Sequence, residues 1–174
     1  TISIFENVEL VSIPDTMLCI GDSVTVTSNS SGTAANFAWS TNADLSSPFA
    51  FGPDSSIKLS PKTTTRYYLQ GINSICFDTD TFDVDIENLT IDVNDFESFC
   101  IYDTIDIRAM VTQASSPLSY SWSPADSILS ATDAISIRIA PLANQFYYLK
   151  TVSQTGCEDF DTVEVEVNLP AFDD

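Results

Sequence analysis

The chain repeats itself once at an offset of about 81 residues, and this repeat constrains the fold more than any other feature. The matched segments, in order, are 19–22 with 100–103, 37–40 with 120–123, 57–61 with 137–141, 67–69 with 147–149 and 76–81 with 157–162. The offset drifts by one or two positions between them, as small insertions in the loops between strands would produce. The order and spacing indicate two consecutive copies of one structural module.

The repeat also sets the boundaries of the modules, because the segment 6–8 recurs as 87–89. No Gly/Ser-rich stretch separates the two copies, so the last strand of the first should run almost directly into the second. We interpret the chain as a fragment of a longer repetitive protein. Four segments are predicted: the end of a preceding module or a linker (1–6), a first module (7–87), a second module (88–169) and a linker to the next module (170–174).

Apolar and polar residues alternate along both modules, which is typical of strands with one face on a core and one in water. Clear examples are the runs 82–87 and 163–167. Seven short strands in about 80 residues indicate an all-β chain of two tandem β-sandwiches, with Trp39 and Trp122 in the core between the sheets. In the first module the strands are predicted near 8–13, 22–28, 36–41, 47–51, 55–60, 65–71 and 79–87, with counterparts in the second.

The composition excludes several classes of function. Twenty-five acidic and six basic side chains give a formal charge of −19, which repels nucleic acid. The chain has no histidine, so it has no Ser-His-Asp triad and no His-ligated zinc. No apolar run reaches the roughly 18 residues of a membrane span. Without a nucleophile elbow or a Gly-rich phosphate loop, the chain is predicted to be no enzyme.

Four cysteines, an even number, predict two disulfides if the chain is secreted. Cys19 and Cys76 are 57 residues apart, as are Cys100 and Cys157, so one interpretation is a bond within each module. Five predicted strands separate the two cysteines of a module, however, and an odd number of reversals places them at opposite ends of the sandwich. The alternative is an inter-module bond between Cys19 and Cys157, with Cys76 and Cys100 reaching preceding and following modules. The parity reverses if the weakly patterned fourth strand is a loop, so both pairings stay open.

Two further groups of side chains are candidate binding sites. Clustered carboxylates can bind calcium, or they can accept backbone N–H bonds in turns and need no cofactor. Tyr68 and Tyr148 fall on the outward side of the sixth strand, where an aromatic ring can stack on a sugar or pack against a loop or a neighbouring module. The six candidate calcium ligands are Asp22, Asp78, Asp80, Asp103, Asp159 and Asp161.

Four motifs of the first module occur in a fixed order: C-x-G-D-x-V-x-V over 19–26, W-S over 39–40, P-x-T-T-T-x-Y-x-L over 61–69 and C-x-x-x-D-T-x-x-V over 76–84. This order resembles the immunoglobulin-like and PKD-like modules of Bacteroidota cell-surface adhesins, such as the gliding-motility adhesins exported by type IX secretion. The second module departs from the pattern, since Tyr102 replaces the glycine and 142–144 replace the threonine run. The resemblance covers nearly the whole chain and implies tandem immunoglobulin/PKD-like β-sandwiches at the extracellular cell surface.

These observations predict non-catalytic structural modules that act as a stiff spacer or stalk in adhesion or gliding motility. Their partners would be the neighbouring modules of the same chain, and the acidic coat would keep adjacent stalks apart. The alternative is a carbohydrate-binding or calcium-dependent adhesive module, with surface polysaccharide as the partner.

Overall fold

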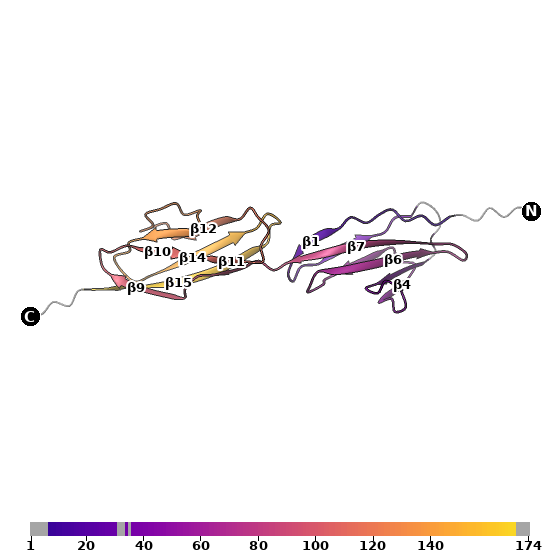
Figure 1. The fold of residues 1–174 in the computed structure, drawn as a ribbon, viewed down its shortest axis with the longest axis horizontal. Coiled ribbons are helices and arrows are strands. Elements are labelled where there is room, and N and C mark those ends of the chain that lie inside the picture. The colour runs from indigo at the N-terminus through magenta and orange to yellow at the C-terminus, as the bar shows by residue number, and fades with distance from the viewer. Residues whose placement is uncertain (1–6, 31–33, 35, 170–174) are drawn as a thin grey trace, which may run out of the picture. The chain divides into compact units, whose positions relative to one another are not determined.

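The structure, a computed structural model, describes residues 7–30, 34 and 36–169. The described residues form fifteen strands, and they include no helix long and apolar enough to cross a membrane. The contacts divide the chain between Ile86 and Glu87 into two compact units, called here the first and the second module. The predicted flanking segments 1–6 and 170–174 lie outside the described residues. The all-β class expected from the period-two pattern is confirmed (Figure 1).

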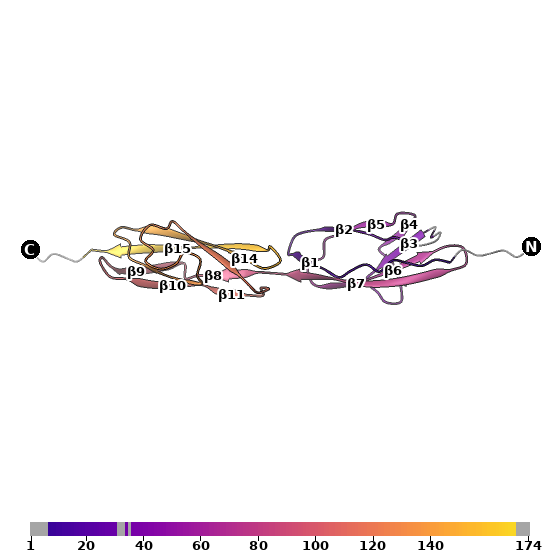
Figure 2. The same cartoon turned by 90° about the horizontal axis from the view of Figure 1, so that it is seen from above.

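The first module is a sandwich of two sheets (Figures 1 and 2). Every second residue of its central strands faces the core, including Tyr67 and Leu69 on one strand and Phe82 and Val84 on the next. The smaller sheet closes the core from the other side with Leu59. The larger sheet has the order β1 (Thr16–Cys19), β7 (Phe77–Glu87), β6 (Thr65–Ile72), β3 (Asn36–Ser40) and β4 (Ala50–Gly52), and the smaller one pairs β2 (Val24–Thr27) with β5 (Ser56–Leu59).

The second module repeats this plan with its own strands. The strands β10 (Ile105–Arg108) and β11 (Met110–Thr112) are separated by Ala109 alone. The chain therefore pairs first with β13 (Ser136–Ile139) and then with β8 (Thr90–Asp92) as it crosses the smaller layer. The larger sheet has the order β9 (Phe96–Cys100), β15 (Glu158–Asn168), β14 (Gln145–Val152) and β12 (Ser119–Ser123). The smaller layer pairs β10 (Ile105–Arg108) with β13 (Ser136–Ile139) and β11 (Met110–Thr112) with β8 (Thr90–Asp92).

The two tryptophans lie on β3 and β12 and are 1% and 3% exposed. Trp39 meets Phe82 edge to face, with ring centroids 6.4 Å apart, and Phe82 stacks on Tyr67 at 5.5 Å. Trp122 instead donates its indole N–H to the carbonyl of Ala134 at 2.9 Å. Large rings therefore fill the space between the sheets in both modules, with different neighbours.

Several predicted strands differ from the observed ones. The predicted strand over 8–13 is reduced to an isolated bridge between Leu10 and Ser30. The strands β1 and β9, which carry the first cysteine of each module, were not predicted. They are four and five residues long and lie at the edge of a sheet, too short to show a clear alternation. Residues 124–135 form no strand in the second module, so the predicted counterpart of the fourth strand is wrong there.

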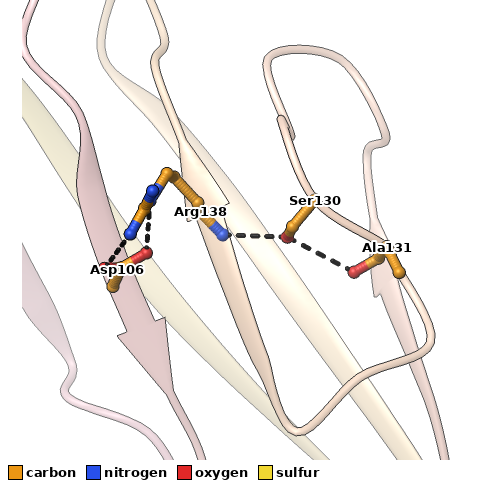
Figure 3. Close-up of polar contacts among 4 residues, drawn as sticks. All are labelled: Asp106, Ser130, Ala131 and Arg138. Carbon is orange, nitrogen blue, oxygen red and sulfur yellow. Dashed lines mark hydrogen bonds and ion pairs between the residues drawn. The ribbon is translucent and has the colours of Figure 1, made fainter.

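Cross-strand ion pairs occupy three of the six basic side chains. The guanidinium of Arg138 on β13 donates two hydrogen bonds of 2.8 Å to Asp106 on β10, and its backbone N–H donates to the hydroxyl of Ser130 (Figure 3). The hydrogen bond from Arg138 holds the pKa of Asp106 below its ordinary value. Six cations cannot neutralise 25 acids, so the surface stays strongly negative. The other two pairs are Arg66–Asp83 and Lys150–Glu158.

Candidate functional site

Two predicted calcium ligands of the first module accept backbone hydrogen bonds from its first segment. Oδ2 of Asp78 accepts the N–H of Leu10 at 2.8 Å, and Oδ2 of Asp80 accepts the N–H of Ile13 at 2.7 Å. Both carboxylates are half-buried and lie on β7, the last strand of the module. They tie the segment that precedes β1 to that strand.

The second module has the same contacts at the repeat-related positions. Oδ2 of Asp159 accepts the N–H of Ile91 at 2.8 Å, and Oδ2 of Asp161 accepts the N–H of Val93 at 2.6 Å. Hydrogen bonds to an ionised acceptor are stronger than neutral ones. We call the paired carboxylates of each module, Asp78 with Asp80 and Asp159 with Asp161, the aspartate clamp.

The other two candidate calcium ligands follow a turn. The backbone N–H of Asp22 donates to the carbonyl of Cys19 at 3.0 Å, and that of Asp103 donates to Cys100 at 3.1 Å. The residue before each aspartate has a positive φ, of 90° at Gly21 and 72° at Tyr102. Among the residues that the structure describes, no three acidic or cysteine side chains are grouped so that they could hold a metal ion. Calcium binding by the six aspartates stays a prediction.

The cysteines differ in oxidation state. Cys19 and Cys157 are disulfide-bonded, whereas Cys76 and Cys100 are free thiols. The interpretation that each module contains its own disulfide is therefore wrong. The disulfide-bonded residues are the first cysteine of the first module and the second cysteine of the second module.

The register of the second module gives the physical reason. The strand β9 runs parallel to β15, with Cys100 opposite Asn168, the last residue of β15. Cys157 immediately precedes the first residue of the same strand. A strand rises about 3.3 Å per residue, so the length of β15 places the two cysteines roughly 35 Å apart. A disulfide requires Cα atoms within about 7 Å. The cysteines thus lie at opposite ends of the module even though a fourth strand is absent from it.

Glu87 is a buried carboxylate where the second module begins. It accepts the backbone N–H of Ser115 at 2.7 Å and the Ser115 hydroxyl at 3.0 Å, and the Thr155 hydroxyl donates to it as well. Burial acts to raise the pKa of Glu87, but the hydrogen bonds from Thr155, Ser115 and Ser153 outweigh it and hold that pKa below its ordinary value. The sequence indicated Glu87 only as part of the repeat, and no motif marks this role.

The carboxylate of Glu87 also orders the turn before a disulfide-bonded cysteine. The backbone N–H of Cys157 donates to the hydroxyl of Ser153 at 3.2 Å, and the N–H of Ser153 donates to the Cys157 carbonyl at 2.9 Å. Because Thr155 lies in this turn and binds Glu87, the entry to the module and the cysteine turn form one hydrogen-bonded unit.

The outer face of the larger sheet of the second module carries a shallow depression of about 320 Å³. Tyr148 on β14 and Phe160 on β15 are both more than half exposed there, and Nζ of Lys150 lies 5.4 Å from the Phe160 ring centroid. The sequence predicted Tyr148 but missed Phe160, which shares the outward side of its strand. The rest of the lining comprises three hydroxyl residues, one aliphatic residue and one acid: Ser121, Ser123, Thr162, Leu149 and Asp161.

The first module lacks this arrangement. Tyr68 is half-buried, and Gln70 and Thr79 occupy the positions that correspond to Lys150 and Phe160. The two tyrosines predicted as glycan contacts therefore lie in different surroundings.

Neither a protein-family profile nor a curated protein sequence matches the chain. Solved structures are similar to it. The N-terminal eight Ig domains of Down Syndrome Cell Adhesion Molecule (DSCAM) give a TM-score of 0.60 at 11% identity, over 92% of this chain and 24% of that one. DIP-gamma IG1+IG2 gives 0.56 at 12% identity, over 92% and 97%, and the titin I-band fragment I67–I69 gives 0.53 at 11% identity, over 95% and 66%. The chain thus consists of two tandem immunoglobulin-like domains.

Replacing Asp161 with Ala is expected to lower the free energy of unfolding of the second module by about 1–3 kcal/mol, because the buried Val93 loses the acceptor of its N–H. Hydrogen exchange of peptides from β14 measures this loss in the whole chain. Asp133→Ala, at an exposed position of the same module, is the control. Equal losses in the two variants would contradict a role for the clamp.

Acidification is expected to remove the contribution of Glu87. A carboxyl with a lowered folded-state pKa stabilises the protein above its unfolded-state pKa and loses this effect as the pH falls through the folded-state value. Wild type should exceed Glu87→Gln in stability near neutral pH, and the difference should shrink progressively below the ordinary pKa of glutamate. Urea denaturation across pH 2.5 to about 7 measures it. Two parallel stability curves would show that Glu87 carries no such contribution.

Proposed function

We propose that the two domains are non-catalytic spacer units of a larger protein at the extracellular cell surface, where they hold an adhesive part away from the membrane. The observation that carries this proposal is the junction. The strand β7 ends at Glu87 and β8 begins at Thr90, so that Asn88 and the buried Leu89 alone separate them. A connection this short, with a buried residue and with Glu87 bonded into the second module, leaves little freedom for reorientation.

Three other features support the proposal. Tandem immunoglobulin-like domains also make up the similar structures of titin, DIP-gamma and DSCAM, and DSCAM is by name a cell adhesion molecule. Disulfide-bonded cysteines favour an oxidising compartment. The motif order of the first module resembles Bacteroidota surface adhesins, which suggests gliding motility and type IX secretion as the setting. The charge of −19 would keep neighbouring stalks apart.

The cysteines extend this proposal. Cys19 and Cys157, the disulfide-bonded residues, would bond to each other and lock the two domains covalently. Such a bond would explain why the second cysteine of the first module and the first cysteine of the second are free. It would make the spacer resistant to bending at its junction.

Small-angle scattering tests the stiffness of the junction. Non-reducing peptide mapping first establishes the Cys19–Cys157 peptide in the wild type. The scattering curve of this protein is then expected to fit one fixed arrangement of the domains. A flexible Gly-Ser insertion between Asn88 and Leu89, measured after reduction, should broaden the distance distribution. The same insertion after Leu142, in an exposed loop, is the control and should not. Freely reorienting domains in the wild type would refute the spacer proposal.

A second candidate function is glycan binding on the outer face of the second domain. The exposed rings of Tyr148 and Phe160 beside Lys150 and three hydroxyl groups favour it, because sugars bind through ring stacking and hydrogen bonds. Among the described residues of the first domain, Gln70 and Thr79 take the places of Lys150 and Phe160. Binding would then depend on one domain only.

On a glycan array, Tyr148→Ala is expected to reduce any signal at least tenfold, because it removes one of the two exposed rings. Tyr68→Ala is the matched control in the first domain and should leave the signal unchanged. An equal loss in both variants, or no binding by the wild type to any polysaccharide, would argue against this face as a glycan site.

A further inference from the structure

The two free thiols are the repeat-related partners of the two disulfide-bonded cysteines. Cys100 corresponds to Cys19, and Cys76 corresponds to Cys157. In each pair, one member is disulfide-bonded and the other is free. The same structural position is thus able to form a disulfide in this fold.

The free thiols lie at sterically accessible positions. Cys100 is exposed at the end of β9, and Cys76 is half-buried in the turn between β6 and β7. In the second domain the register excludes a bond between Cys100 and Cys157, which lie at opposite ends of β15, and in the first domain Cys19 is disulfide-bonded while Cys76 is free. Their partners must therefore come from outside their own domain.

Exposed apolar side chains flank both free thiols. Ile75 and Phe77 stand on either side of Cys76, and Tyr102 follows Cys100 by two residues. Leu169 follows Asn168, which pairs with Cys100. The positions that correspond to Phe77 and Tyr102 in the other domain are Glu158 and Gly21, whereas the oxidised Cys19 has the exposed Ile20 beside it. Apolar surface around a reactive group is typical of a surface that another molecule covers.

From these observations we infer that Cys100 of one copy of this chain forms a disulfide with Cys76 of a second copy, head to tail. The inference rests on the proposed pairing of Cys19 with Cys157, which it repeats between copies. As the S–S bond forms, the two thiols lose two protons and two electrons, which a small disulfide such as oxidised glutathione accepts to become two thiols. Because each copy keeps one free thiol of each kind, the joint is heterologous and extends into a linear array.

Two single variants test the joint. Cys76→Ser keeps only the Cys100 thiol free, and Cys100→Ser keeps only the Cys76 thiol. Each variant is incubated alone and in an equimolar mixture in a glutathione redox buffer. The salt concentration is about 0.5 M, at which the screening length falls to on the order of 4 Å and the repulsion between the acidic copies weakens.

On a non-reducing gel the mixture is expected to give a dimer band that disappears on reduction, and mass spectrometry should identify a Cys100–Cys76 peptide. The amount of dimer should be at least tenfold above that of either variant alone. The wild type should give a ladder. If each variant alone formed as much dimer as the mixture, the oxidation would be unselective and the inference would be overturned. So would a mixture in which the thiols become glutathionylated and the copies stay monomeric.

Apolar contacts supply a second readout. Phe77→Ser should slow dimer formation in the mixture several-fold, and Phe51→Ser, which removes an equally exposed phenylalanine on β4, should not. Equal rates in these two variants would remove the docking role of the apolar residues. The outcome is independent of the scattering experiment, since a stiff junction within one copy can exist without any joint between copies.

Discussion

The hydrogen bonds between the first segment of each module and the carboxylates of its last strand fix much of the remaining architecture. In the second module the first segment pairs with β11 in the smaller layer and then crosses to β15 in the larger sheet. Backbone N–H groups in such a crossing have no ladder partner, and a buried N–H without an acceptor costs about 1–3 kcal/mol. Asp161 accepts the bond of Val93, which follows β8, and Asp159 accepts that of Ile91 on β8 itself. Once the crossing is fixed, the parallel register of β9 on β15 follows.

This register decides the chemistry of the cysteines. A strand of eleven residues lies between the two cysteine positions of the module, and no rotamer spans that length. The cysteines of this domain can therefore form a disulfide only with a cysteine outside the domain. Glu87 orders the turn that precedes the disulfide-bonded Cys157 through its hydrogen bond from Thr155.

The sequence predicted the features that repeat or alternate. The 81-residue offset marked the modules, and the alternation in runs such as 163–167 marked the buried sides of the strands. It could not predict β1 and β9, because a short strand at the edge of a sheet is defined by its neighbouring strand and not by its own pattern. The role of Glu87 depends on hydroxyl side chains distant in the sequence, and that of Phe160 on Lys150 in the adjacent strand. Contacts of this kind leave no local signal.

The strong negative charge determines which associations between copies can persist. Two copies of charge −19 repel at separations up to about the screening length, roughly 8 Å in physiological salt. The apolar residues beside Cys76 and Cys100 are few, so their burial alone offsets little of the entropy lost on association. A covalent bond does not have this limitation, because its strength is independent of salt and of the dilution of the copies. For the proposed acidic spacer, a cysteine therefore offers a joint between copies that the charge does not weaken once it has formed.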